Sequence, residues 1–372
     1  MKLLRTMGRG RKTSVLSQAL MLTLCISTAA NVLADVTPEQ LQPLRALREG
    51  DASGVAQASK LAKELAKRND LNALTVLRAM KGASPLGKNW LLGVANAAQN
   101  KQPATNQDLE RFLADLSQDG EARYTVFRWL TDKDETAKNK FLDAMLEDPS
   151  LELRYEAVAR SLSPKDLDET TLKRLLDVAR QPEQVTEIIE RLGKSGIKVD
   201  QSKHFGFLSS WKFIGPFDNT GSASFNKAYP VEADWVANKL ADSYEGKSGA
   251  TKWISEASED PNGLVDLAKL YNNEKGCVVY GVTEVDSSKA LDCELRVGCI
   301  NAQKVWLNSE LVISNEVYHT GMQVDQYIAP IKLKAGKNRI LIKICQNEQK
   351  EAWAQRYVFQ ARICDSSGKA IQ

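Results

Sequence analysis

Residues 36 to 194 show the spacing of amphipathic helices, with apolar residues returning every three or four positions. The segment Thr37-Pro38-Glu39 is a helix start signal, because a capping hydroxyl precedes a proline and an acid of the first turn. Further helices are predicted over residues 52–67, 169–179 and 182–192. The N-terminal half is therefore predicted to be all-α.

A weak internal repeat lies within this helical stretch. RFLADLSQDGEARYTVFRWL, from Arg111, is similar to KFLDAMLEDPSLELRYEAVARSL, from Lys140, and Arg123 matches Arg154 at a spacing of 31 residues. Paired helices that repeat in this way bury their apolar faces by stacking. The second segment resembles part of a HEAT repeat, in which an Asp-Pro turn precedes an arginine and an apolar stripe. We expect a HEAT-like array of helical hairpins over residues 35–195; a generic helical bundle is the alternative.

Beyond a predicted linker at residues 196–204, the pattern changes to short alternating runs separated by turn residues. In CELRVGCINAQKVWLNSELVI, residues 293–313, every second residue up to Cys299 is apolar, and Asn308-Ser309 is a predicted tight turn. We expect this stretch to form a hairpin. Further strands are predicted by the same alternation over residues 278–285, 324–333, 339–345 and 356–364. Residues 205–372 are therefore predicted to form an antiparallel β-sandwich or jelly roll.

The strings VWLNSELV, AGKNRILIKI and YVFQARICDSSG resemble the galactose-binding-like jelly roll, including the sugar-binding-type domains attached to many bacterial glycoside hydrolases. Trp306 and Asn308 match the family's Val-Trp-Leu-Asn-Gly strand end, with Ser309 in place of the usual glycine. Gly336 and Asn338 match its Gly-x-Asn turn. The resemblance implies the fold of the C-terminal half. It implies less about function, because the fold serves ligand-binding and purely structural domains alike.

The N-terminus changes the charge balance. Residues 1–34 contain five basic residues and no acid, so the remaining chain carries 45 basic and 47 acidic residues instead of a net charge of +3. A basic segment to Lys12, an apolar run over residues 15–30 and the small residues before Asp35 predict a signal peptide cleaved near Ala34; an uncleaved N-terminal anchor is the alternative. We therefore expect a secreted, periplasmic or cell-envelope protein with no membrane span after cleavage. The balanced charge argues against a nucleic-acid partner.

Five cysteines follow the signal peptide, so at least one stays unpaired within the chain. Cys277 opens one predicted strand and Cys364 closes the last, so a disulfide between them is a hypothesis; buried free thiols are the alternative. Cys293 and Cys299 lack zinc-ligand spacing, and no metal ligands are predicted. Related jelly rolls often hold Ca²⁺, but no Asp-x-Asp-x-Asp-Gly string identifies a site here.

Candidate catalytic groups are few. The only histidines are His204 and His319, and His319 alone has acids near it in sequence, Glu316 and Asp325. A loop hydrogen bond is the simpler role for His319, compared with a Ser-His-Asp triad. A two-carboxylate glycosidase stays open, although the sequence singles out no pair of acids. We predict no catalytic residues.

Sugar binding requires exposed aromatic faces for stacking and amides or carboxylates for hydroxyl groups. The loop QNEQKEAW, between two predicted strands, offers both, and two other loops add candidates. The predicted ligand-binding residues are Gln346, Asn347, Glu348, Trp353, Asp218, Asn219, Tyr318 and His319. The alternative for Trp353 is a plug in the core, and Trp306 is expected to pack.

These patterns favour a non-catalytic binding or scaffolding protein whose sandwich recognises a glycan or an envelope or secreted protein. An accessory module of a carbohydrate-active hydrolase, or such a hydrolase itself, is the first alternative. A purely structural envelope protein is the second.

Overall fold

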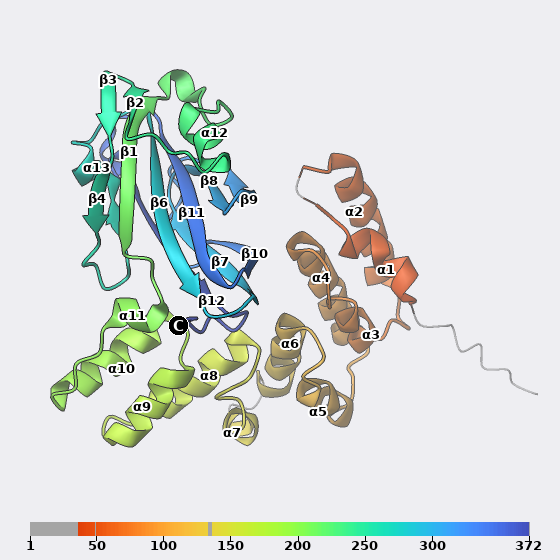
Figure 1. Ribbon diagram of the computed structural model, residues 1–372. Coiled ribbons are helices and arrows are strands. Elements are labelled where there is room, and N and C mark those ends of the chain that lie inside the picture. The colour runs from red at the N-terminus through yellow and green to blue at the C-terminus, as the bar shows by residue number, and fades with distance from the viewer. Residues whose placement is uncertain (1–35, 49, 133–135, 372) are drawn as a thin grey trace, which may run out of the picture.

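The computed structural model describes residues 36–48, 50–132 and 136–371 (Figure 1). The predicted signal peptide lies outside the described residues. The chain is α plus β, as expected: α-helices follow one another from Pro38 to Phe205 among the described residues, and antiparallel sheets form after them. None of the helices within the described ranges combines the length and apolarity needed to cross a membrane.

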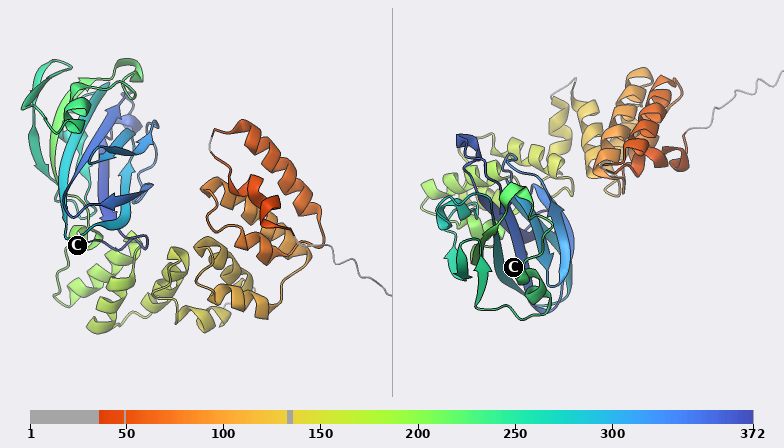
Figure 2. Two further views of the ribbon diagram at one scale, coloured as in Figure 1. Left: turned by 45° about the vertical axis from the view of Figure 1, so that its right-hand side comes forward. Right: turned by 90° about the horizontal axis from the view of Figure 1, so that it is seen from above.

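The helical part forms a curved row that begins away from the sheets and ends beside them, where α11 leads into β1 (Figures 1 and 2). Its helices are α1 (Pro38–Arg45), α2 (Ala52–Lys67), α3 (Ala73–Arg78), α4 (Pro85–Lys101), α5 (Asn106–Ala114), α6 (Gly120–Thr131), α7 (Thr136–Leu142), α8 (Leu151–Leu162), α9 (Glu169–Val178), α10 (Pro182–Lys194) and α11 (Gln201–Phe205).

Local side-chain chemistry fixes where these helices begin. The Thr37 hydroxyl accepts a hydrogen bond from the amide of Gln40, whose side chain returns to the Thr37 amide, so the predicted start is a complete capping box. Asp51 and Ser84 cap α2 and α4 with a side-chain oxygen that accepts from the amides of Gly54 and Gly87. The predicted helices at residues 52–67, 169–179 and 182–192 are confirmed to within two residues.

The two repeat arginines, Arg123 and Arg154, are buried and converge on one turn. Both terminal nitrogens of Arg123 on α6 donate to the carboxylate of Asp148, at 2.7 and 2.8 Å. Arg154 on α8 donates through Nε to the Asp148 carbonyl, at 2.8 Å. The repeated arginines therefore join consecutive helical pairs around Asp148.

The predicted linker is partly helical, which corrects the expectation for residues 196–204. Asp200 accepts a hydrogen bond from the Lys203 amide at 2.9 Å and caps α11. Gly206, with φ of 72°, ends the helix by donating to carbonyls of its last turn. A start signal and a stop signal with five residues between them thus form a short helix inside the connection.

Two antiparallel sheets pack face to face and are called the sandwich below. The six-stranded sheet has the order β4-β1-β6-β11-β8-β9, and the four-stranded sheet has the order β10-β7-β12-β5. The strands are β1 (Ser210–Asp218), β4 (Ile254–Ala257), β5 (Val265–Asp266), β6 (Cys277–Ser287), β7 (Leu291–Cys299), β8 (Ala302–Leu307), β9 (Glu310–Asn315), β10 (Tyr327–Leu333), β11 (Gly336–Gln346) and β12 (Val358–Cys364).

Of the predicted hairpin over residues 293–313, the turn at Asn308 and the pairing of the two strands around it are confirmed. Asn308, with φ of 55°, turns β8 into β9, and Leu307 pairs with Glu310. The preceding strand β7 does not pair with β8, because it joins β10 and β12 in the other sheet. Its apolar face, Cys293 to Cys299, still points into the core as the alternation predicted. The polar break at Asn301 is where the chain crosses between sheets.

The interior of the sandwich holds aromatic and branched side chains from both sheets, including Trp211, Phe213 and Phe359, whose rings contact one another. The outer face of the six-stranded sheet is covered by α12 (Pro230–Val236) and the β2–β3 ribbon (Ser243–Gly246 and Gly249–Lys252). Beneath this cover, the buried ammonium of Lys343 donates to Glu232 Oε1 at 3.0 Å. A short helix, α13 (Leu267–Leu270), follows β5.

The hypothesis of a Cys277–Cys364 disulfide is wrong for this structure, in which both cysteines are free and buried. Cys277 pairs in register with Gln346, at the end of the sandwich where β11 stops. The strand β12 starts at that end and finishes at Cys364, so the two thiols lie at opposite ends of the sandwich. Cys293, Cys299 and Cys345 are also buried free thiols.

Candidate ligand-binding rim

The strand register brings two of the predicted loops together. Cys277, the first residue of β6, pairs with Asp218 of β1 on one side and with Gln346 of β11 on the other. The segments that follow Asp218 and Gln346 therefore leave the same end of the six-stranded sheet side by side. Together with Tyr318 and His319 they form a cluster that we call the loop rim, made of residues 218–221, 318–319 and 346–353.

Asn219 is the centre of this cluster and is fully buried. Its Nδ2 donates to the Gln346 carbonyl at 3.0 Å and to the Tyr318 hydroxyl at 3.2 Å, while its Oδ1 accepts from the Ser224 amide at 3.0 Å. Burial raises the pKa of Tyr318, so its hydroxyl stays protonated. Asn219 thus ties all three loops together, and its burial makes it a positioning residue.

Gln346 is also buried. Its Oε1 accepts from Asn301 Nδ2 at 2.6 Å, and its Nε2 donates to the Arg356 carbonyl at 3.3 Å. Asn301 was not among the predicted site residues, although it lies in the polar break after β7. A buried polar residue directly after an apolar strand is the signal that could have identified it.

Trp353 is the most exposed aromatic side chain of the rim, with 60% of its surface accessible. The ring of His319 stands nearly perpendicular to the indole, with centroids 5.1 Å apart and an interplanar angle of 87°. His319 Nε2 in turn donates to Asn347 Oδ1 at 2.8 Å. The alternative in which Trp353 plugs the core is wrong, because the indole is exposed outside the core. It contacts the ring of His319, which in turn is hydrogen-bonded to Asn347.

The two rim carboxylates hold the loop after β1. Asp218 Oδ1 accepts from the Thr220 hydroxyl at 2.6 Å, and this hydrogen bond lowers the pKa of Asp218. Glu348 Oε1 accepts from the amide of Gly221. Glu348 itself is exposed, as is Trp353.

The eight predicted residues therefore come together at one end of the sandwich, although they perform different tasks. Asn219 and Gln346 are buried and structural, and Asp218, Tyr318, His319 and Asn347 are half-buried supports. Trp353 and Glu348 present exposed surface. The arrangement offers an indole, an amide and a carboxylate to a ligand. The ring of His319 is bound to an amide oxygen, which fits a positioning role.

The residues behind the family resemblance lie at the opposite end of the sandwich. Asn308 Oδ1 accepts from the Arg339 amide at 3.1 Å, and Asn338 Oδ1 accepts from the Lys334 amide at 3.0 Å. Trp306 is partly buried and packs against the core under α12. Asn308 and Asn338 therefore stabilise turns, and Trp306 packs against its neighbours. None of the three belongs to the loop rim.

A hollow that sequence reasoning missed lies on the outer face of the six-stranded sheet and measures about 940 Å³. Trp235, Trp253 and Arg339 line it, and the Trp253 Nε1 donates to the Ala241 carbonyl at 2.8 Å. Trp235 is buried beneath Arg339, whose guanidinium lies 4.3 Å from its ring centroid. Within the described ranges, no three His, Cys, Asp or Glu side chains are grouped as a metal site would require.

Comparison with known proteins places this chain in no established family. No family model and no curated protein matches it. Weak structural neighbours are glycoside hydrolases. One is a β-glucosidase from Kluyveromyces marxianus, with 16% identity and a TM-score of 0.20 over 26% of this chain and 11% of that chain. Another is the GH31 α-xylosidase from Xanthomonas citri, with 10% identity and a TM-score of 0.18 over 30% of this chain and 15% of that chain. The chain thus spans 11% and 15% of these two enzymes.

Proposed function

We propose that this chain is a secreted or cell-envelope binding protein without catalytic activity, whose sandwich recognises a glycan at the loop rim. The sandwich would be a galactose-binding-like jelly roll. The helical row would be a HEAT-like array that presents a second surface to a partner protein.

One observation carries this proposal: the exposed indole of Trp353 is held in place by the rim. An unsupported tryptophan on a loop would lose side-chain freedom on binding, and that loss opposes association. Here the contacts of Trp353 with His319, and of His319 with Asn347, limit this freedom before a ligand arrives. A preorganised indole suits stacking against the apolar face of a pyranose ring.

The groups beside the indole supply the polar half of such a site. Glu348 offers a carboxylate acceptor and Gln349 an exposed amide, five and four residues before Trp353. Asn347 Nδ2 donates to Gln349 Oε1 at 2.9 Å, so the two amides form one hydrogen-bonding unit. Acceptors and donors around an aromatic platform match the hydroxyl groups of a sugar.

A glycan-array screen of the purified chain tests the proposal. Wild type is compared with Trp353→Ala and with Leu311→Ala, a matched control that removes an exposed apolar side chain near the β8–β9 turn, away from the rim. We expect wild type and Leu311→Ala to bind the same glycans and Trp353→Ala to lose them. A silent array with folded protein would contradict glycan recognition, and retained binding in Trp353→Ala would move the site elsewhere.

The non-catalytic part of the proposal has its own test. Each glycan that binds is incubated with the chain, and reducing ends are measured over time. We expect no increase above a buffer control. Release of sugars by wild type that is lost in Glu348→Gln would favour the hydrolase alternative.

A further inference from the structure

Each sheet of the sandwich ends in a free strand on the same side, β9 in one sheet and β10 in the other. The two strands lie next to each other, and Figures 1 and 2 show this side of the sandwich turned toward α2 and α4. Across the described ranges, the backbone of β9 is hydrogen-bonded to no strand other than β8. The amides and carbonyls that β9 turns away from β8 are therefore open to a further strand.

The other edge strands carry features that oppose pairing with another chain. β10 contains Pro330, which has no amide to donate, and the exposed Lys332. The edge strands β4 and β5 are only four and two residues long. β9 has six residues, none of them proline or lysine, and it pairs with β8 on both sides of a single register shift at Val312. It is therefore the longest edge strand without these two protecting residues.

Exposed apolar side chains lie on this side of the sandwich. Leu311 on β9 and Val317, two residues beyond the strand, are each 47% exposed. Ile328 on β10 is 52% exposed. Leu311 pairs in register with the partly buried Trp306, so the two side chains share one face of the sheet. An apolar side chain of an added strand would pack beside Leu311, and burial of apolar surface favours association.

The charges at the two ends of β9 favour one kind of strand. Glu310 begins β9, Glu316 follows its last residue, and both are exposed. Among the described residues, neither carboxylate forms an ion pair. Lysine or arginine at both ends of an added strand would complement these two acids.

The lysines of the neighbouring strands have other partners. Lys304 on β8 donates to Asn226 Oδ1 at 2.8 Å, and its ammonium lies 4.6 Å from the Phe225 ring centroid. Lys332 on β10 forms an ion pair with Asp292 at 3.8 Å. The two glutamates are therefore the charges that β9 itself offers to a partner.

A second copy of this chain is a poor occupant of the edge. Two β9 strands that paired antiparallel about a two-fold axis would bring Glu310 and Glu316 of different copies together. Like charges opposite each other destabilise a strand pair. The acids thus oppose self-association and favour a basic partner.

We propose that the free edge of β9 binds an extended, basic segment of a partner protein, which joins the six-stranded sheet as a further strand. Main-chain hydrogen bonds to β9 supply the affinity, and the contacts with Leu311, Glu310 and Glu316 supply the selectivity. The proposal does not rest on glycan recognition at the loop rim.

The test measures binding of a fluorescent synthetic peptide to the whole chain by fluorescence anisotropy. Valine alternates with threonine in this peptide, and lysine stands at each end. One control peptide has glutamate at each end, and the other has N-methyl groups on its valines and threonines, which remove the amide donors. We expect the lysine-ended peptide to bind saturably and each control to bind about tenfold or more weakly.

Variants of the chain locate the binding. Leu311→Lys gives the edge the charge that protected edges carry and should weaken binding about tenfold or more. Leu116→Lys, a matched change at an exposed position between α5 and α6, should bind as wild type does. Glu310→Lys combined with Glu316→Lys should reverse the preference, so that the glutamate-ended peptide binds better. All these positions are exposed, and circular dichroism checks that the variants fold.

Three outcomes would overturn the proposal. The first is the absence of saturable binding by the lysine-ended peptide. The second is binding that persists in Leu311→Lys and does not respond to the charge reversal. The third is self-association of wild type in sedimentation that is lost in Leu311→Lys, which would assign the edge to a second copy. Trp353→Ala should still bind the peptide, and Leu311→Lys should still bind any glycan found on the array, so the two proposals fail separately.

Discussion

His319 and Trp353 form an edge-to-face pair, with 5.1 Å between their ring centroids, at the exposed end of the sandwich. Such aromatic pairs contribute about 0.5–1.5 kcal/mol beyond buried area. Removing His319 would therefore leave the indole in place but less ordered.

We expect His319→Ala to weaken binding of any glycan found on the array by about two- to tenfold, and Trp353→Ala to abolish it. Isothermal titration calorimetry of both variants measures the difference. His319→Phe keeps the ring contact and should restore most of the affinity. If His319→Ala binds as wild type does, the pair plays no part in positioning the indole.

The buried ion pair between Arg123 and Asp148 should dominate the stability of the helical part. Asp148→Asn leaves the guanidinium buried and without its charge partner, which typically costs about 3–5 kcal/mol. Urea unfolding followed by circular dichroism measures the loss. The control is Glu169→Gln, which disrupts the exposed pair with Lys173 and should cost about 0.5 kcal/mol or less. Similar costs for the two variants would show that burial does not strengthen the Arg123 contact.

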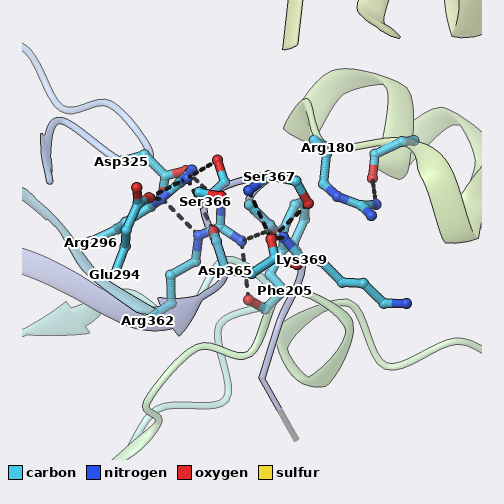
Figure 3. Close-up of polar contacts among 12 residues, drawn as sticks. Arg180, Phe205, Glu294, Arg296, Asp325, Arg362, Asp365, Ser366, Ser367 and Lys369 are labelled. Carbon is cyan, nitrogen blue, oxygen red and sulfur yellow. Dashed lines mark hydrogen bonds and ion pairs between the residues drawn. The ribbon is translucent and has the colours of Figure 1, made fainter. Parts of the chain in front are cut away.

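We expect the contacts of Asp325 with Arg296 and Arg362 to make the stability of the protein sensitive to acid. Arg296 Nη1 donates to its Oδ2 at 2.8 Å and Arg362 Nε to its Oδ1 at 2.7 Å (Figure 3). Burial acts to raise the pKa of Asp325, but the hydrogen bonds and charges of Arg362 and Arg296 outweigh it and lower the pKa overall. Its stabilisation is therefore complete above the unfolded pKa of about 3.9 and is lost as pH falls through the lowered folded value.

Chemical unfolding between about pH 5 and pH 2 measures this dependence. Asp325→Asn should be less stable than wild type at pH 5, and the difference should shrink as the pH falls. A constant difference over that range would contradict the assignment to Asp325.

Gly298 allows the loop before β10 to lie against the four-stranded sheet. A Cβ at this position would lie 2.4 Å from the Gln323 carbonyl oxygen. Gly298→Ala should displace the loop that carries His319 and Asp325, and so reduce both stability and glycan binding. Gly93→Ala is the control, because its Cβ would meet open space on α4 and should stabilise the helix by up to about 1 kcal/mol. Wild-type stability in Gly298→Ala would show that the loop is not held there.

The buried thiols should be unreactive in the folded state. Burial raises the pKa of Cys277, Cys299 and Cys345 to about 12 each, so almost no thiolate exists at pH 8. We expect alkylation of Cys277 and Cys364 only after unfolding, without reducing agent, as measured by mass spectrometry. A peptide pair linked through these two cysteines would contradict the free thiols.

Local sequence was enough where the physics is local. The cap at Thr37 and the alternation from Cys293 to Cys299 were predictable because a capping hydrogen bond spans three residues and a strand has a period of two. The short helix α11 carries similar start and stop signals at Asp200 and Gly206, but the five residues between them are too few to show a helical apolar period. The loop residues of the rim were also predictable by type, since exposed aromatics and amides gather on loops.

The tertiary structure decided which of these elements meet. Nothing in the spacing between β7 and β8 says that they belong to different sheets, because pairing depends on the packing of two whole faces. The strand register places Cys277 between Asp218 and Gln346, which brings the loops of the rim together. Cys364 lies at the other end of the sandwich, where β12 ends. Arg180 of the helical part and Gly368 of the C-terminal segment likewise line one hollow although they are far apart in sequence. Only the packing of the helical part against the sandwich brings them together.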